Sequence, residues 1–306
     1  MGIIGGGFVG SAYARVFQQY TDVRVFDLER TRRTHSLPDV VKQDVLFVCL
    51  PTPMRPDGTV ETSIVRDALE HIRANSAEWK PVILKSTIPP KDLWDLHLEF
   101  HQEIYLVFSP EFLTERTAEY DLQQSTRFIF GVNSQELGLR PQRPQAREMI
   151  ELLFEQRFPN VSQHWVPFAT ASLVKYFTNM FFATKISLMN EFSAVAAAWN
   201  QSGQEVINLM MLDPRIGKSH FLVPGHDGEL GFGGHCFIKD AMGYMHLAKD
   251  GHVDPEMAQA AWRTNVTYRG AEVLARELTR MVGRAAVEPF TPEDVRGLEE
   301  QFQEKE

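Results

Sequence analysis

The residues with the clearest chemical potential lie in the stretch Gly231–Asp240, which reads Gly-Phe-Gly-Gly-His-Cys-Phe-Ile-Lys-Asp. If Cys236 opens a helix, Lys239 and Asp240 follow one turn later on the same face. A helix N-terminus and a nearby ammonium both favour thiolate over thiol, and a carboxylate one turn away is able to hold or deprotonate a water. These residue types suit the formation and hydrolysis of a thioester. The alternative is a buried structural cysteine after a Gly-rich turn.

The composition is ordinary for a globular chain and excludes several classes of protein. The 306 residues suggest two domains. Forty acidic and 31 basic residues give a net charge of −9, which argues against nucleic acid or an anionic membrane as partner. Cys49 and Cys236 form neither a disulfide framework nor a zinc motif, so we expect no metal. The N-terminus lacks the features of a signal peptide, and we expect a cytoplasmic protein.

A nucleotide-binding pattern opens the chain. Gly5, Gly7 and Gly10 match the spacing G-x-G-x-x-G between a short strand and a helical pattern. Such glycines bring backbone N–H groups to a pyrophosphate, whose charge the helix N-terminus receives. The next strand ends in Asp27, whose carboxylate suits the ribose of NAD and repels the 2′-phosphate of NADP. The pattern predicts NAD, although the arginines within 30–33 are able to reverse that preference.

Strand and helix signals then alternate up to residue 166. The expected strands are 2–4, 23–26, 44–50, 81–84, 104–108, 127–130 and 161–166. Helices between buried strands predict an α/β fold with a doubly wound, Rossmann-like parallel sheet. Ligands bind such sheets beyond the carboxyl ends of the strands, where Pro51, Thr52, Thr87 and Glu111 fall.

The second half of the chain is helical in its pattern. Residues 168–200 contain no glycine or proline, and apolar residues cover more than one face, as in a buried helix or a subunit interface. Lys175 and Asn179 project together from it, either as a snorkelling lysine and a surface amide or as an oxyanion-binding pair. Further helices are expected at 203–212, 237–249 and about 254–283, with a last one starting at Thr291. We expect an NAD-binding domain at 1–166, an all-helical central domain at 167–262 for dimerisation and catalysis, and a helical tail at 263–306.

Several of these stretches together resemble one family. The chain is similar to the UDP-glucose/GDP-mannose (nucleotide-sugar) 6-dehydrogenases, and its motifs are closest to those of the UDP-glucose enzymes. The matching stretches, in the family's order, are Gly5–Gly10, Cys49-Leu-Pro51-Thr-Pro53, Lys85-Ser-Thr87-Ile-Pro, Ser109-Pro-Glu111-Phe-Leu-Thr-Glu115, Lys175-Tyr-Phe-Thr-Asn179, Asn190-Glu191, Arg215-Ile-Gly217 and Gly231–Asp240.

The resemblance implies a four-electron oxidation of a sugar C6 alcohol with two NAD. Cys236 would capture the aldehyde as a thiohemiacetal, which is oxidised to a thioester and released by water as the carboxylate. Lys175 and Asn179 would stabilise the alkoxide and the oxyanions. UDP-glucose is the expected substrate, with GDP-mannose as the runner-up.

The resemblance also implies roles for the other site residues. Glu111 would be the general base, and Thr87 and Asp240 would position and activate water. The implied NAD-binding residues are Gly5, Gly7, Phe8, Val9, Gly10, Asp27, Pro51, Thr52, Thr87 and Lys239. The implied substrate-binding residues are Glu111, Phe112, Leu113, Glu115, Lys175, Asn179, Arg215, Phe221 and Gly233.

Departures from the family leave alternatives open. The family's third, nucleotide-gripping domain is expected to be replaced by the short helical tail. The loop at 213–235, with Arg215, Lys218 and His220 as cations, and the neighbouring subunit of a homodimer or higher oligomer are expected to bind the substrate diphosphate instead. Two rivals are a two-electron hydroxyacid dehydrogenase, which needs no cysteine, and a non-catalytic NAD-binding homologue.

Overall fold

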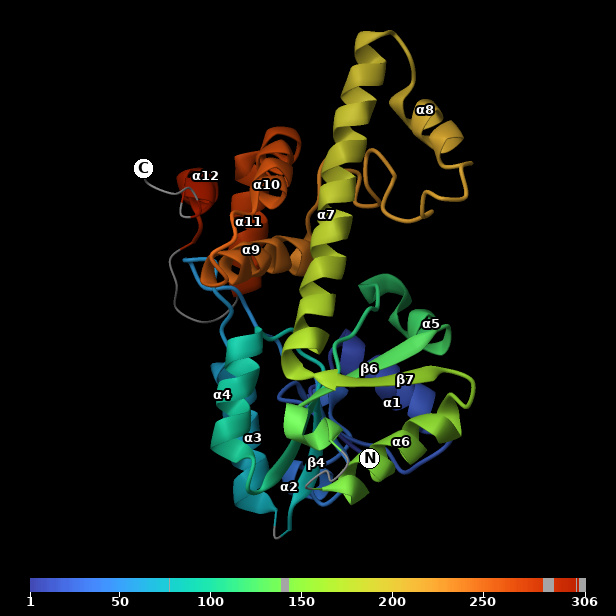
Figure 1. Cartoon of the computed structure of the whole chain (residues 1–306), viewed down its shortest axis with the longest axis vertical. Coiled ribbons are helices and arrows are strands. Elements are labelled where there is room, and N and C mark those ends of the chain that lie inside the picture. Colours follow the sequence, from blue (N-terminus) through green and yellow to red (C-terminus); the bar gives the residue numbers. More distant parts are fainter. Residues whose placement is uncertain (77, 139–142, 283–288, 301, 303–306) are drawn as a thin grey trace. The chain divides into compact units, whose positions relative to one another are not determined.

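The computed structural model describes residues 1–76, 78–138, 143–282, 289–300 and 302, which form two compact units (Figure 1). The first unit comprises Met1–Thr52 and Glu61–Lys175, and the second comprises Pro53–Val60 and Tyr176–Glu306. The chain therefore passes between the units three times, since the short segment Pro53–Val60 leaves the first unit and returns to it.

The first unit is built on a seven-stranded sheet with the order β2-β1-β3-β4-β5-β6-β7. Its strands are β1 (Gly2–Ile4), β2 (Arg24–Phe26), β3 (Leu46–Val48), β4 (Lys80–Leu84), β5 (Ile104–Phe108), β6 (Arg127–Val132) and β7 (Ser162–Pro167). The neighbours from β2 to β5 pair in parallel, as the alternation of strands and helices predicts. The expected doubly wound sheet is thus confirmed.

One pair of strands departs from the expected all-parallel sheet. β5 and β6 are antiparallel and meet at Phe108 and Gly131, whereas β6 and β7 are again parallel. The connection between β5 and β6 contains the six-residue helix α5 (Ala118–Gln123), about 9 Å long. It packs against α1 (Phe8–Phe17) and is too short to carry the chain back along a strand of about 17 Å. The 14-residue α6 (Pro144–Arg157), about 21 Å long, makes the parallel return from β6 to β7.

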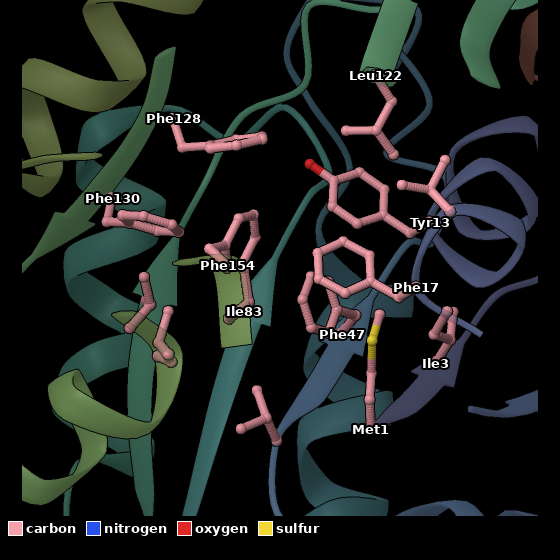
Figure 2. Close-up of a cluster of buried hydrophobic side chains, with 14 of the residues drawn as sticks. Met1, Ile3, Tyr13, Phe17, Phe47, Ile83, Leu122, Phe128, Phe130 and Phe154 are labelled. Carbon is pink, nitrogen blue, oxygen red and sulfur yellow. The ribbon is translucent and has the colours of Figure 1, made fainter. Parts of the chain in front are cut away.

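Helices cover both faces of the sheet. The remaining elements of this unit are α2 (Leu37–Val41), α3 (Ser63–Asn75), α4 (Pro90–Phe100) and the short 3-10 helices η1 (Arg30–Arg32), η2 (Glu115–Thr117) and η3 (Ser134–Leu137). One core lies under α1 and α6, where Figure 2 shows aromatic rings gathered against the strands. Phe154 of α6 packs against Phe128 and Phe130 of β6, with ring centroids 4.7 and 5.0 Å away. The other core contains side chains of α3 and α4.

The second unit is mainly helical. They are α7 (Phe168–Ala198), whose first residues belong to the first unit, α8 (Gly203–Met210), α9 (Gly234–Asp250), α10 (Glu256–Arg269), α11 (Ala271–Val282) and α12 (Pro292–Glu300). The single helix expected at about 254–283 is wrong. Gly270, with φ of +84° and ψ of +139°, separates α10 from α11, because these dihedral angles lie far from those of an α-helix. Thr291 caps α12 as expected, and its hydroxyl accepts the N–H of Asp294.

The segment Pro53–Val60 is part of this second unit. It turns back on itself, with Met54 opposite Val60. His246 of α9 is hydrogen-bonded through Nε2 to the carbonyl oxygen of Asp57 at 2.8 Å. Gly58, with φ of +81°, leaves room for the imidazole ring.

No helix in the described ranges is both long and apolar enough to cross a membrane.

Candidate functional site

The turn between β1 and α1 has the form of an anion cradle. Gly5 has φ of +99°, and a Cβ atom added to Gly10 would overlap the carbonyl oxygen of Gly5. The space beside Gly7 is open. Gly7 is the N-cap residue of α1 and provides no side-chain hydrogen bond, and the first turn of α1 has no acidic residue. Its free N–H groups and the positive end of the helix dipole therefore suit a phosphate, and the turn fits the pyrophosphate of NAD.

Asp27, directly after β2, holds the glycine turn. One carboxylate oxygen accepts the N–H of Gly6 at 2.6 Å, and the other accepts the N–H of Glu29 at 2.7 Å. A carboxylate has about four lone-pair sites, so Asp27 retains acceptor capacity for a ribose hydroxyl while it fixes the turn.

The ends of β3 and β4 are tied together beyond the sheet. The hydroxyl of Thr52 donates to the carbonyl oxygen of Thr87 at 2.9 Å, and that of Ser86 donates to the carbonyl oxygen of Leu50 at 2.5 Å. Pro51 between them is exposed. Phe8 and Val9 lie on the first turn of α1 and pack against the core beneath it. The predicted NAD-binding residues of the first unit thus lie at the carboxyl ends of β1 to β4.

Glu111 and Lys175 form a buried ion pair in the first unit. The ammonium donates to the Glu111 carboxylate at 3.0 Å and to its backbone carbonyl oxygen at 2.8 Å. The other carboxylate oxygen accepts the N–H of Leu113 at 2.6 Å, and the ammonium lies 5.6 Å from the centroid of the Phe112 ring. Lys175 is thus held by a predicted substrate-binding segment, whereas Glu115 is exposed in η2.

Lys85 is a buried cation to which the sequence reasoning gave no role. It follows β4, is 2% exposed, donates to the hydroxyl of Ser109 at 3.1 Å and lies over the Tyr13 ring. Burial lowers the pKa of Lys85 to about 7, and burial likewise raises the pKa of the nearby Cys49 thiol to about 12. A lysine directly after an apolar strand covered on both faces was the available signal.

Asn179 and Asp240 meet in the second unit. The Asn179 amide donates to one oxygen of Asp240 at 2.5 Å, and Lys239 forms an ion pair with the other at 2.5 Å. Asp240 is completely buried, and the Lys239 side chain is 12% exposed. The carboxylate therefore has a partner at each oxygen, and Lys239, predicted to bind NAD, is here the counter-ion of Asp240.

Cys236 lies in the first turn of α9, as expected. The helix begins at Gly234 after Gly233, has no side-chain cap, and places Lys239 and Asp240 one turn after the cysteine. Cys236 is half-buried. The sequence thus predicted the shared helix correctly, and the half-buried thiol is not in the fully buried setting of a structural cysteine.

The loop before α9 carries the predicted diphosphate cations. The exposed guanidinium of Arg215 pairs with Asp213 at 2.6 Å. His220 stacks on Phe182 with ring centroids 4.0 Å apart, and burial lowers its pKa, which disfavours the cationic form expected for diphosphate binding. Phe221 packs in a small apolar cluster.

The predicted site residues are divided between the two units, and each unit contains one hydrogen-bonded pair of them. Glu111 joins Lys175 in the first unit, and Asn179 joins Asp240 in the second. Lys175 and Asn179 occupy the same helix, α7, but each has its own carboxylate partner.

Two stretches of the chain match known domains. Residues 27–156 match the NAD binding domain of the UDP-glucose/GDP-mannose dehydrogenase family, and residues 169–267 match the central domain of the same family. The chain belongs to this family. Its first unit contains the family's NAD-binding domain, as the glycine turn and Asp27 predicted.

Individual relatives agree with this membership. UDP-glucose 6-dehydrogenase AglM of Haloferax volcanii is 28% identical over 252 residues, which make up 78% of this chain and 55% of the relative. The match to the structure of a UDP-glucose dehydrogenase from Pyrobaculum islandicum covers 87% of this chain and 67% of that enzyme, with 24% identity and a TM-score of 0.74. The match to the structure of the GDP-mannose dehydrogenase of Pseudomonas aeruginosa covers 98% of this chain and 78% of that enzyme, with 17% identity and a TM-score of 0.62. The two structures show the shared fold. The chain spans about half the length of the curated relatives it matches.

Proposed function

We propose that this protein oxidises the C6 alcohol of a nucleotide sugar to the carboxylate, with UDP-glucose as substrate and UDP-glucuronate as product. The observation that supports this most directly is the arrangement on α9, where a half-buried Cys236 precedes by one turn a fully buried Asp240 that binds Asn179. A two-electron alcohol oxidation needs no thiol, whereas a four-electron oxidation needs a nucleophile to hold the aldehyde.

The proposed reaction balances as one alcohol, one water and two NAD⁺ giving one carboxylate, two NADH and three protons. NAD, held at the glycine turn, would supply the hydride acceptor for each of the two oxidations. Between them, the Cys236 sulfur bonds to the aldehyde carbon and the aldehyde oxygen takes a proton. In the last step, water adds to the thioester carbonyl, the carbon–sulfur bond breaks, and the thiol is restored.

The chain's own polar groups have defined tasks in this scheme. The Asn179 amide nitrogen carries two hydrogens. One is directed at Asp240, and we assign the other to the oxyanion of the thiohemiacetal. Lys175 supplies an ammonium whose position is fixed by Glu111. The loss of one oxyanion donor typically costs about 3–4 kcal/mol of transition-state stabilisation.

Asp240 and Thr87 are assigned to the water of the hydrolytic step. Asp240 is bound by Lys239 and Asn179, which hold its carboxylate in one orientation, as a residue that activates water requires. General-base action by Glu111 stays a prediction, since its carboxylate holds Lys175 in this structure.

Counting NADH per molecule of product tests the proposal. With UDP-glucose and NAD, the wild-type protein should form two NADH per uronate, measured by absorbance and chromatography. Cys236→Ser should not complete the second oxidation at the wild-type rate. Cys49→Ala, which removes the half-buried cysteine of the first unit, is the matched control and should keep the ratio of two. A ratio of one, with full activity in Cys236→Ser, would instead establish the two-electron rival.

Thermal shift with NAD plus each sugar nucleotide tests the substrate. UDP-glucose should stabilise the protein by about 2.7 kcal/mol at a hundredfold excess over Kd. Stabilisation by GDP-mannose alone would establish the runner-up. NAD binding with no turnover of UDP-glucose, GDP-mannose or UDP-N-acetylhexosamines would establish a non-catalytic homologue.

We also propose that the protein forms a homodimer through α7 and α8. Large apolar side chains are exposed on these helices and directly after α7, with Phe181 65%, Trp199 76% and Leu209 64% accessible. Such side chains on two neighbouring helices favour burial against a second copy. Light scattering at micromolar concentration should give at least twice the mass of 34.9 kDa.

A further inference from the structure

The backbone before α9 is held by a buried asparagine of α10. The N–H of Phe232 donates to Oδ1 of Asn265 at 2.6 Å, and Nδ2 of Asn265 donates to the carbonyl oxygen of Phe232 at 3.0 Å. Asn265 is completely buried. From the other side, Asn190 of α7 accepts the N–H of Gly231 at 3.1 Å. A single amide thus satisfies both polar groups of Phe232, four residues before Cys236.

A buried arginine at the end of α10 holds the adjoining residues. The Arg269 side chain is 2% exposed. Its guanidinium binds Glu277 of α11 at 2.5 and 3.0 Å and Asp227 at 2.7 Å. It also donates to the carbonyl oxygen of Leu230 at 3.2 Å. A planar fork of five N–H donors is able to bridge these acceptors, which a single ammonium cannot reproduce.

The two side chains account for two glycines of the Gly231–Asp240 stretch. A Cβ atom on Gly231 would overlap Oδ1 of Asn265, and a Cβ atom on Gly233 would overlap the guanidinium of Arg269. These two glycines therefore make room for protein side chains. Gly233 directly precedes the first residue of α9, so the arginine lies beside the point at which the cysteine-bearing helix begins.

We propose that Arg269 and Asn265 are positioning residues for Cys236. They fix the backbone of 231–233 so that α9 starts at Gly234 and holds the thiol in its first turn. The inference rests on the proposed function, because positioning matters only if Cys236 reacts. The inference also gives α10 and α11 a task in catalysis, although both helices extend into the predicted tail. α11 supplies Glu277, which holds Arg269 in place.

Thiol alkylation and amide exchange in the ligand-free protein test the inference without turnover. A Cys49→Ala background leaves Cys236 as the only thiol. In Arg269→Lys, we expect exchange at the Phe232 amide to be about tenfold faster or more, as a charge-assisted hydrogen-bond network is lost. The pH midpoint for alkylation of Cys236 by iodoacetamide should rise, because a frayed first turn no longer stabilises the thiolate. Arg276→Lys, an exposed site on α11, is the matched control and should change neither.

A milder variant guards against loss of the fold. Glu277→Gln keeps the shape of the side chain but weakens its hold on Arg269, and it should shift both measurements in the same direction by a smaller factor. Where the substrate is turned over, kcat should fall and KM for NAD should stay, since the NAD cradle is in the first unit. Wild-type exchange at Phe232 with a wild-type alkylation midpoint in both variants would overturn the inference. Equal loss of protection throughout α9 to α11 would also overturn it, since Arg269 would then support the fold alone. Absence of turnover with the predicted shifts in exchange and alkylation would instead count against the proposed function.

Discussion

Replacing Lys175 alone should destabilise the protein more than replacing both members of its ion pair. The Lys175 and Glu111 side chains are only 4% and 8% exposed. Removal of one partner of a buried pair typically costs about 3–5 kcal/mol, because the other charge remains buried without compensation. In Lys175→Met, Glu111 keeps the N–H of Leu113 but loses the ammonium. We expect a decrease of about 3–4 kcal/mol in the free energy of unfolding.

The other two variants of the cycle separate charge from packing. In Glu111→Gln, Lys175 keeps the backbone carbonyl oxygen at 2.8 Å and loses one charged hydrogen bond, so we expect a cost of about 2–3 kcal/mol. In the double variant Lys175→Met/Glu111→Gln no buried charge of the pair remains. We expect a cost of about 1–2 kcal/mol for the unpaired amide hydrogens of glutamine, well below the sum of the single variants.

Urea unfolding of the four proteins at one pH, followed by circular dichroism, gives the coupling energy. Lys91→Met, at an exposed lysine of α4, is the control and should change the free energy by less than about 0.5 kcal/mol. Effects that add to within about 0.5 kcal/mol would refute the reasoning, because Lys175 and Glu111 would then not act as a coupled buried pair.

Three further predictions concern other parts of the molecule. Lys85→Met should be more stable than the wild type at pH 7, and this difference in the free energy of unfolding should shrink as the pH rises to 10. The pKa of Lys85 in the folded protein is about 7, so above pH 7 the unfolded wild type holds a proton that the folded wild type has lost. The free energy of unfolding of the wild type therefore rises by up to about 1.4 kcal/mol per pH unit. Gly10→Ala should destabilise the first unit, since its Cβ overlaps Gly5, whereas Gly7→Ala should keep wild-type stability and weaken NAD binding measured by calorimetry. Phe181→Glu combined with Trp199→Glu should give a monomer by light scattering.

Each of these predictions has an outcome that contradicts it. A pH-independent difference between Lys85→Met and the wild type would mean that Lys85 stays protonated in the folded protein. Unchanged NAD affinity in Gly7→Ala would show that the pyrophosphate does not bind in the open space beside Gly7. A dimer that persists in the double glutamate variant would exclude the exposed face of α7 as the interface.

The sequence predicted the features that depend on local pattern. Glycine spacing, apolar runs and the i, i+4 rule were sufficient to place the cofactor turn, the strand ends, and Cys236 with Asp240 on one helix. These features need only a few neighbouring residues, whose conformational preferences act before any tertiary contact.

Pairings between distant residues could not be predicted in this way. Glu111 and Lys175 are 64 positions apart, and Asn179 and Asp240 are 61 positions apart. Lys175 and Asn179 were expected to act as one pair because they share a helix, yet each is bound by a carboxylate from elsewhere in the chain. The antiparallel β5–β6 pair depends similarly on where a six-residue helix packs, which no periodicity encodes.

The segment Pro53–Val60 is synthesised long before the residues that it binds. The ribosome delivers it between β3 and α3, but the imidazole that binds Asp57 belongs to His246, 189 positions later. At about 5–20 residues per second, the interval is roughly ten to forty seconds. For that time the nascent chain carries a hairpin whose Met54, 1% exposed in the finished protein and part of the second unit's core, lacks the residues that cover it. The hairpin therefore stays without its partner until the chain reaches α9, and during that time it is a binding site for a chaperone that recognises short apolar hairpins.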